Sequence, residues 1–187
     1  MRRSLLILLP LSVLALSAGK AAAQTAPVPH PVLVTVPPAK PEDVASIDAI
    51  LAALYEVISG PAGQARDWNR MRSLFIPGGR LMPTAVRPDG SVITRILEVN
   101  DYIATSGPSL ERLGFTEREI ARRVEQYGHI AHVFSTYEGR TETEPTVIRG
   151  INSIQLLNDG TRWWVVSIYW EAERPDNPLP PQYLSTP

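Results

Sequence analysis

The chain of 187 residues contains no cysteine and only three histidines, and its formal net charge is -1. The absence of cysteine excludes disulfide bonds, iron–sulfur clusters, thiolate zinc sites and cysteine nucleophiles. The histidines lack a His-x-x-x-His spacing and no loop gathers aspartates, so we predict no metal site. A charge this balanced predicts no nucleic-acid partner, because domains that bind nucleic acids are usually basic. Neither a Gly-x-Ser-x-Gly turn nor a phosphate-binding glycine loop is present, so we also predict no cofactor.

Long apolar runs are absent as well, apart from one short run near the N-terminus. Arg2 and Arg3 precede an apolar run over residues 5–16, and small residues follow up to Ala23. The run is shorter than the roughly 20 residues that cross a bilayer, and this order of charged, apolar and small residues is typical of a secretory signal peptide. We predict cleavage after Ala23, a periplasmic or secreted protein, and no membrane span in the mature chain.

Proline is concentrated at the two ends of the chain. Residues 24–44 form a proline-rich segment that we interpret as an extended linker, and residues 174–187 form a proline-rich C-terminal tail that we interpret as a spacer. The folded domain is therefore expected over residues 45–173.

Two helices are expected first. The first, over residues 47–58, carries a single apolar stripe made of Ile47, Ile50, Leu51, Leu54 and Ile58. A second helix begins after a cap at Asp67 and presents Phe75 to the core. Strands follow over residues 80–86 and 91–97, and Asn100 is expected to cap a short helix through Ile103 that Gly107 and Pro108 end.

Residues 115–127 are ambiguous. Thr116 and Glu119 form a capping box that favours a helix, but the β-rich segment 130–137 follows at once after a tight Gly128–His129 turn, so we predict a strand. Two further strands are expected over residues 150–157 and 162–171. Helices followed by antiparallel strands predict an α+β domain.

The leading helix pair, the Gly128-x-x-Ala131 entry to a strand and the closing strand with Trp163, Trp164 and Trp170 resemble the NTF2-like superfamily. The resemblance covers residues 45–173 and is closest to uncharacterised exported bacterial members. It implies a cone in which N-terminal helices pack in a strongly curved antiparallel sheet, leaving a pocket at the wide end. Relatives include ketosteroid isomerases, scytalone dehydratases, polyketide cyclases and non-catalytic domains.

The resemblance also allows the isomerase roles to be checked in this chain. A ketosteroid isomerase needs a base, a tyrosine and a protonated acid. The matching positions hold Ala53 for the tyrosine, Pro83 for the base and Ser153 for the acid, while Tyr55 lies two residues away, about 200° around the helix. All three roles are therefore expected to be vacant. An enzyme of the dehydratase kind would instead use His132 as its catalytic residue, with a carboxylate from Asp67, Glu98, Asp101 or Glu125.

For the pocket we expect an apolar wall with a few polar groups, made of His132, Phe134, Ser153, Trp164 and Trp170. The mixed charges between Glu117 and Glu125 are expected at a solvated surface or an oligomer rim. The other face of the sheet is expected to join two copies into a homodimer. The sequence thus predicts a domain that binds a small hydrophobic molecule without catalysis. The alternatives are an enzyme that uses His132, and an assembly module.

Overall fold

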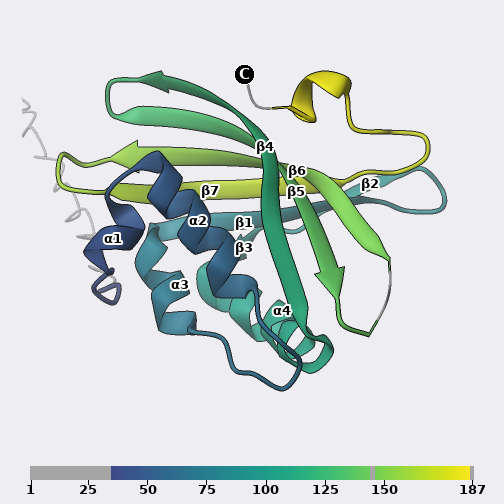
Figure 1. Ribbon diagram of the computed structural model, residues 1–187, viewed down its shortest axis with the longest axis horizontal. Helices are drawn as coiled ribbons and strands as arrows, with labels where there is room; N and C mark the ends of the chain where they lie inside the picture. Colours follow the sequence, from purple (N-terminus) through teal and green to yellow (C-terminus); the bar gives the residue numbers. More distant parts are fainter. Residues whose placement is uncertain (1–34, 144–145, 186–187) are drawn as a thin grey trace, which may run out of the picture. The chain divides into compact units, whose positions relative to one another are not determined.

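A computed structural model describes residues 35–143 and 146–185 (Figure 1). The predicted signal peptide and the first part of the predicted linker lie outside the described residues. The elements in chain order are α1 (Pro41–Val44), α2 (Ile47–Ile58), α3 (Trp68–Leu74), β1 (Phe75–Val86), β2 (Val92–Thr94), β3 (Leu97–Glu98), α4 (Val99–Leu113), β4 (Phe115–Tyr127), β5 (Ile130–Thr141), β6 (Val147–Asn158), β7 (Trp163–Ala172) and the 3-10 helix η1 (Pro181–Tyr183). No helix in this part of the chain is both long and apolar enough to span a bilayer.

The strands form one curved sheet in the order β2-β1-β7-β6-β5-β4, with β3 pairing to β1. The expected α+β class and the strand over residues 115–127 are confirmed. The sheet is mixed rather than antiparallel, however, because β1 and β7 run parallel. Short hairpins force antiparallel pairing between consecutive strands, but most of the domain separates β1 from β7, so no turn sets their relative direction.

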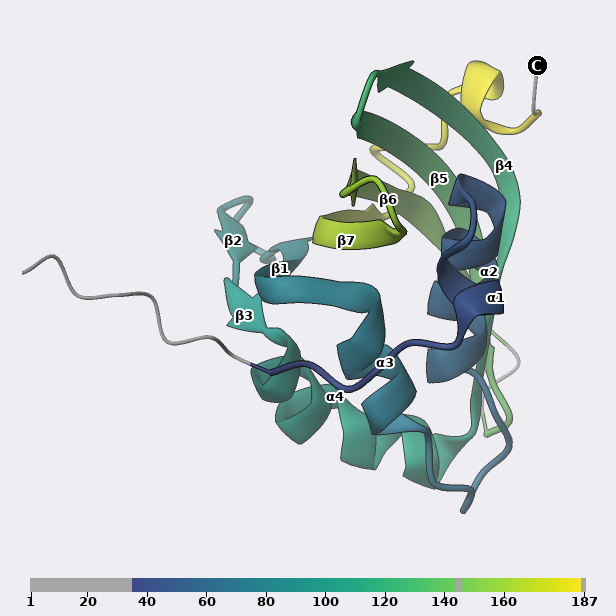
Figure 2. The ribbon, with the colours of Figure 1, turned by 90° about the vertical axis from the view of Figure 1, so that its left-hand side faces the viewer.

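Helices α2, α3 and α4 lie on one side of the sheet, which bends around them (Figure 2). Their starts follow local chemistry: Ser46 accepts a hydrogen bond from the Ala49 amide at 3.1 Å, and Asp67 accepts one from the Arg70 amide at 2.9 Å. The predicted helix over residues 47–58 is confirmed as α2. Its apolar stripe packs with residues of α3, β1, β5, β6 and β7 in one core.

The N-terminal limit of the folded part differs from the prediction. Residues 41–44 of the expected extended linker form the helix α1, in which Asp43 and Val44 are buried. Arg70 of α3 binds the Asp43 carboxylate with two hydrogen bonds, of 2.7 and 2.8 Å. A bidentate, charge-assisted pair of this kind fixes the segment to the domain.

Helix α4 is longer than the sequence predicts. It does not end at Gly107 but continues through Pro108 to Leu113, and its cap is Glu98 rather than Asn100. Gly107 lies against Trp68, because a Cβ atom placed on it would come within 3.0 Å of the indole ring. Tertiary packing on Trp68 therefore outweighs the local preference of glycine and proline to end a helix.

A bulge in β7 changes which tryptophans face the helices. Gln155 of β6 pairs with Ser167, but Leu156 pairs with Val165, so Val166 is an extra residue. The pocket wall expected from the sequence contains both Trp164 and Trp170, which strict alternation along the strand would place on one face; the bulge puts them on opposite faces. Trp163 is buried in the core, whereas Trp164 stacks on the Arg162 guanidinium at 3.6 Å on the opposite side.

The C-terminal tail is not a free spacer. Within the described residues of segment 174–187, Leu179 is buried and η1 lies against the outer face of the sheet, the side away from the helices. Thr136 of β5 donates a hydrogen bond to the Tyr183 carbonyl at 2.6 Å, and the rings of Tyr183 and Phe134 lie 5.2 Å apart. The tail thus covers part of the face predicted to join two copies.

Arg66 joins the loop after α2 to helix α4. It is 7% exposed, and its guanidinium donates hydrogen bonds to the carbonyl oxygens of five residues: Ile58, Gly60, Pro61, Gln64 and Leu110. These carbonyls include ends of α2 and α4, which need donor partners because no further helical turn supplies them. Arg66 therefore holds the two helices at a set separation.

We predict that Arg66→Met lowers the free energy of unfolding by about 3 kcal/mol, because the buried carbonyl oxygens lose a charged donor. Arg118→Met is the control, since Arg118 is exposed and pairs with Glu138 on the surface at 3.2 Å; a change below about 1 kcal/mol is expected there. Urea denaturation of the two variants measures both values. Equal effects in the two variants would contradict this role of Arg66.

Candidate functional site

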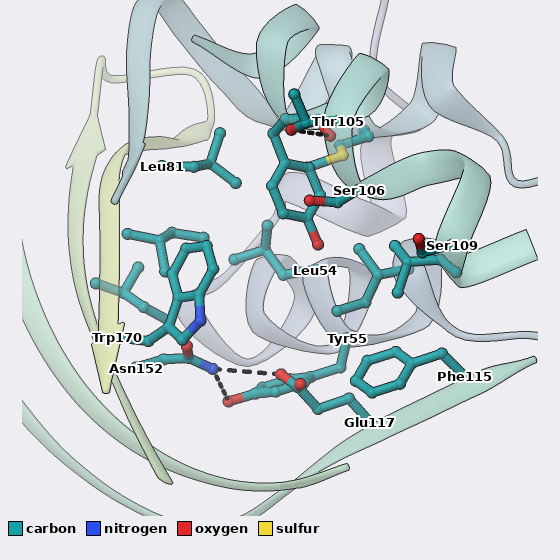
Figure 3. A pocket seen from close by; sticks show the side chains of 16 residues that line it. Leu54, Tyr55, Leu81, Thr105, Ser106, Ser109, Phe115, Glu117, Asn152 and Trp170 are labelled. Carbon is teal, nitrogen blue, oxygen red and sulfur yellow. Dashed lines mark hydrogen bonds between the residues drawn. The ribbon is translucent and has the colours of Figure 1, made fainter. Parts of the chain in front are cut away.

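A cavity of about 360 Å³ lies between the helices and the sheet (Figure 3). Its walls come from α2, α3, α4 and strands of the curved sheet. The lining side chains that are apolar or aromatic are Leu54, Ile58, Met71, Leu81, Leu110, Phe115, Ile154, Ile168 and Trp170. The side chains that carry polar groups are Tyr55, Tyr102, Thr105, Ser106, Ser109, Glu117 and Asn152. The cavity is thus a mostly apolar space with a few polar positions, as in small-molecule sites.

Glu117 places a carboxyl group in this wall from strand β4. Burial raises the pKa of Glu117 to about 7, while a hydrogen bond from Asn152 opposes the rise. Low surrounding polarity disfavours the charged form of a carboxyl, so the proton is held more tightly than in water. At neutral pH the group is therefore present in both protonation states.

Asn152 of β6 links Glu117 to Tyr55 of α2, as Figure 3 shows. Its amide nitrogen lies 3.4 Å from Glu117 Oε1 and 3.2 Å from the Tyr55 hydroxyl. The Tyr55 hydroxyl in turn lies 2.7 Å from Ser135 Oγ of β5. Burial raises the pKa of Tyr55 well above its usual range, so this phenol stays protonated.

Tyr102 reaches the cavity from α4. The residue is 8% exposed, and its ring meets Trp170 edge to face at a centroid distance of 6.2 Å. Within residues 35–143 and 146–185 its hydroxyl has no hydrogen-bond partner and borders the open space of the cavity. Burial, with a smaller contribution from the charge of Glu117, raises the pKa of Tyr102 above its usual range. Hydroxyl groups in such surroundings are normally paired, so this one is available to a ligand.

Of the five residues predicted to line a pocket, Trp170 is the one that lines this cavity. His132, Phe134 and Ser153 lie on the outer face of the sheet, because Val133 and Ser135 occupy the helix-facing positions of β5. Trp164 also lies outside this cavity, whereas Phe134 and Ser153 line a second pocket, of about 450 Å³, together with Trp170.

His132 on the outer face has partners of its own. His132 Nε2 lies 3.0 Å from Ser153 Oγ, and Nδ1 lies 4.0 Å from the exposed Glu125. His132 therefore has no access to the cavity between helices and sheet. No group of three or more histidine, aspartate or glutamate side chains within the described residues is arranged to hold a metal ion.

The sequence interpretation missed Glu117 and Tyr102. Glu117 shares a face with Phe115 and Glu119, and this alternation was the signal available in the sequence. Its neighbouring arginines suggested a solvated strip instead, because exposed and cavity-facing charges alternate along a strand. Tyr55 lines the cavity together with Leu54, whereas the position assigned to the isomerase tyrosine, Ala53, does not.

We predict that the free energy of unfolding falls as the pH rises from about 4.5 to about 7. In this window the folded chain keeps a proton on Glu117 that an unfolded chain, with an ordinary pKa of 4.5, has lost. Glu117→Gln removes that dependence and is more stable than the wild type at pH 8, by on the order of 2 kcal/mol.

Glu125→Gln, on the same strand but with an exposed side chain, is the control and keeps the wild-type pH profile. Urea denaturation at pH 4.5, 6 and 8 measures the difference between variants. Parallel profiles for the wild type and Glu117→Gln would show that Glu117 has an ordinary pKa.

Comparison with known proteins found similarity to solved structures. No family model matches the sequence, and no curated protein matches it. The Kfla4162 protein from Kribbella flavida is 11% identical, with a TM-score of 0.52 over 70% of this chain and 90% of the other. An NTF2-like protein of unknown function from Silicibacter pomeroyi is 15% identical, with a TM-score of 0.47 over 69% and 94%.

A further neighbour is an NTF2-like superfamily protein from Salmonella enterica, 15% identical, with a TM-score of 0.47 over 72% of this chain and 87% of the other. At sequence identities this low, structural similarity indicates a shared fold and carries no information about activity. The curved sheet around helices in this chain is a fold shared with the Kribbella flavida protein, the reported neighbour with a TM-score above 0.5.

Proposed function

We propose that the cavity binds a small, mostly apolar molecule that carries one carbonyl group. The observation that carries the proposal is a pair of groups in a mostly apolar wall: the Tyr102 hydroxyl, which has no partner within the described residues, and the protonatable Glu117 carboxyl. A ligand that satisfies both would supply a missing hydrogen bond, and its apolar part would gain by leaving water.

The chemistry of the two groups favours an acceptor. A phenol and a neutral carboxylic acid each donate one hydrogen bond, and a carbonyl oxygen has two lone pairs to accept them. When Glu117 is ionised it can only accept, so it then repels a carbonyl oxygen and suits a hydroxyl group instead. The protonation state of Glu117 thereby selects the kind of polar group that is bound.

Three tyrosines from three elements surround Glu117: Tyr55 of α2, Tyr102 of α4 and Tyr137 of β5. Burial raises the pKa of each of them above the usual range, so they do not titrate near pH 7. Glu119, on the same strand as Glu117, is paired with Arg122. A pH dependence of binding between pH 6 and pH 8 is therefore assigned to Glu117.

A second candidate function is acid–base catalysis on such a carbonyl compound. It is favoured by the pKa of about 7 for Glu117, because a group near the working pH can both take and return a proton. This candidate differs from the enzyme expected with His132, which lies on the outer face. The open cavity supports ligand binding over a docking module, for which a filled interior is expected.

We predict that 2-acetylnaphthalene raises the melting temperature more than 2-ethylnaphthalene does, because only the ketone accepts hydrogen bonds. Tyr102→Phe weakens ketone binding about fivefold and leaves hydrocarbon binding unchanged.

In the wild type, ketone affinity falls about tenfold between pH 6 and pH 8, as the fraction of neutral Glu117 falls. Isothermal titration calorimetry measures these affinities.

Glu117→Gln is the matched control for pH, since its amide donates at every pH and should remove the pH dependence. Equal affinities for ketone and hydrocarbon, in the wild type and in Tyr102→Phe, would contradict the proposal.

We also propose that the protein is exported and acts outside the cytoplasm, as the pattern over residues 1–23 indicates. Expression of the full chain in a Gram-negative bacterium should give a periplasmic product whose first residue is Gln24. N-terminal sequencing measures this, and a cytoplasmic product that still begins at Met1 would contradict export.

A further inference from the structure

A chain of hydrogen bonds leads from the cavity to Glu119, on the far side of Tyr55. Beyond Asn152 it passes through the Tyr55 hydroxyl and Ser135 Oγ, which lie 2.7 Å apart, and Ser135 contacts the Glu119 carboxylate. Ser135 is fully buried and Tyr55 is 8% exposed, so water does not compete along most of the chain. Arg122 Nη1 binds the other oxygen of Glu119 at 3.2 Å.

The bulge in β4 makes the end of this chain possible. Glu119 pairs with Tyr137, but Ala121 pairs with Thr136, so Ile120 is an extra residue in the strand. Glu119 and Arg122 therefore face the same side of the sheet, toward α2. Arg122 also pairs with Asp48 of α2, which anchors the arginine.

The direction of each hydrogen bond in this hydrogen-bond chain can be assigned by starting from Glu119. A carboxylate paired with arginine only accepts, so the single hydrogen of Ser135 goes to Glu119. Ser135 then accepts from Tyr55, whose own hydrogen is thereby used. Tyr55 can only accept from Asn152, which must present its amide nitrogen and not its carbonyl oxygen. The second amide hydrogen of Asn152 points to Glu117.

We propose that Glu119 is a positioning residue that sets the donor pattern of the cavity by fixing the direction of this hydrogen-bond chain. The hydrogens of Tyr55 and Asn152 are then used within the hydrogen-bond chain, and the hydrogens of Tyr102 and neutral Glu117 are left to meet the ligand. Because Asn152 occupies Oε1 of Glu117, the proton of the neutral acid sits on Oε2. The ligand class follows: a compound that offers an acceptor oxygen to two donors. This ligand class rests on the proposed function, whereas the direction of the chain does not.

Glu119→Gln tests the direction of the chain. Arg122 can only donate, so in this variant it holds the oxygen of the new side-chain amide and turns the amide nitrogen toward Ser135. Each bond then reverses: the new amide donates to Ser135, Ser135 to Tyr55, and Tyr55 to the carbonyl oxygen of a rotated Asn152. That oxygen now faces Glu117, which must keep its proton to bond with it.

The expected result is a rise of about one unit or more in the titration midpoint of Glu117. If Glu119 acts through its charge alone, removing a neighbouring negative charge lowers that midpoint, so a fall or no change would overturn the proposal. The readout is the carbon-13 NMR titration of the Glu117 carboxyl in the full chain without ligand, assigned with Glu117→Gln.

Ser135→Ala provides the control background. Ser135→Ala interrupts the hydrogen-bond chain, so Glu119→Gln can then act only through charge. The double variant should therefore show no rise in the Glu117 midpoint over Ser135→Ala alone. A rise that persists in the double variant would also overturn the proposal. Thr136→Ala, which removes an equally buried hydroxyl from the outer face of the same strand, should leave the midpoint in place.

A measurement on the wild type keeps the proposal testable if Glu119→Gln does not fold. Nuclear Overhauser effects should connect the Asn152 amide hydrogens to the Tyr55 ring, and their absence, with the amide signals assigned, would contradict the assigned direction.

Ketone binding separates this proposal from the proposed function. At pH 6, Glu119→Gln should bind 2-acetylnaphthalene several-fold less tightly than the wild type, because the Glu117 proton is then donated to Asn152 and not to the ligand. A raised midpoint without any ketone binding would refute the proposed function and leave the positioning role intact. Ketone binding together with a lowered midpoint would refute the positioning role alone.

Discussion

The site depends on the burial of one carboxyl group, Glu117, in a wall of apolar side chains. Leaving water costs an ionised carboxylate several kcal/mol unless charged partners replace its hydration. Among the described residues, the hydrogen-bond partner of this carboxyl is one neutral amide, that of Asn152. The pKa of about 7 follows from that imbalance. A chain that needed only a filled core would gain stability from an apolar residue at this position, and the proposed ligand would account for the carboxyl.

The fold makes room for this group by keeping the helices apart. Arg66 holds the ends of α2 and α4 through backbone carbonyls, and Gly107 lets α4 pack closely on Trp68. The remaining space is closed by the bent sheet, whose parallel β1–β7 pair carries Leu81, Ile168 and Trp170 into the wall. The cavity is therefore a consequence of polar contacts at the helix ends as well as of sheet curvature.

Much of the fold could be predicted because its signals are local. The apolar stripe of α2, the turn at Gly128 and the β-rich segments after it depend on neighbouring residues, and they appear as expected. The α+β class followed from their order along the chain. Helix α4 differs because its extent is set by contact with Trp68, which comes well before it in the sequence and gives no local signal.

The site was harder to predict because it depends on which face each strand turns inward. One extra residue at Val166 moves Trp164 outward, and the tail packing on Phe134 and Thr136 makes the outer face of β5 look like a core. Both faces of that strand carry buried residues, so the pattern of polar and apolar residues could not separate them. Glu117 was assigned to a charged surface for the related reason that its partner, Asn152, lies in a distant strand.

Burial of Glu117 deep enough to hold its proton near neutral pH is the condition on which the site's chemistry rests. The most direct test is a carbon-13 NMR titration of the Glu117 carboxyl in the wild-type protein. We predict a midpoint of about 7, and a midpoint near the ordinary value of 4.5 would contradict this.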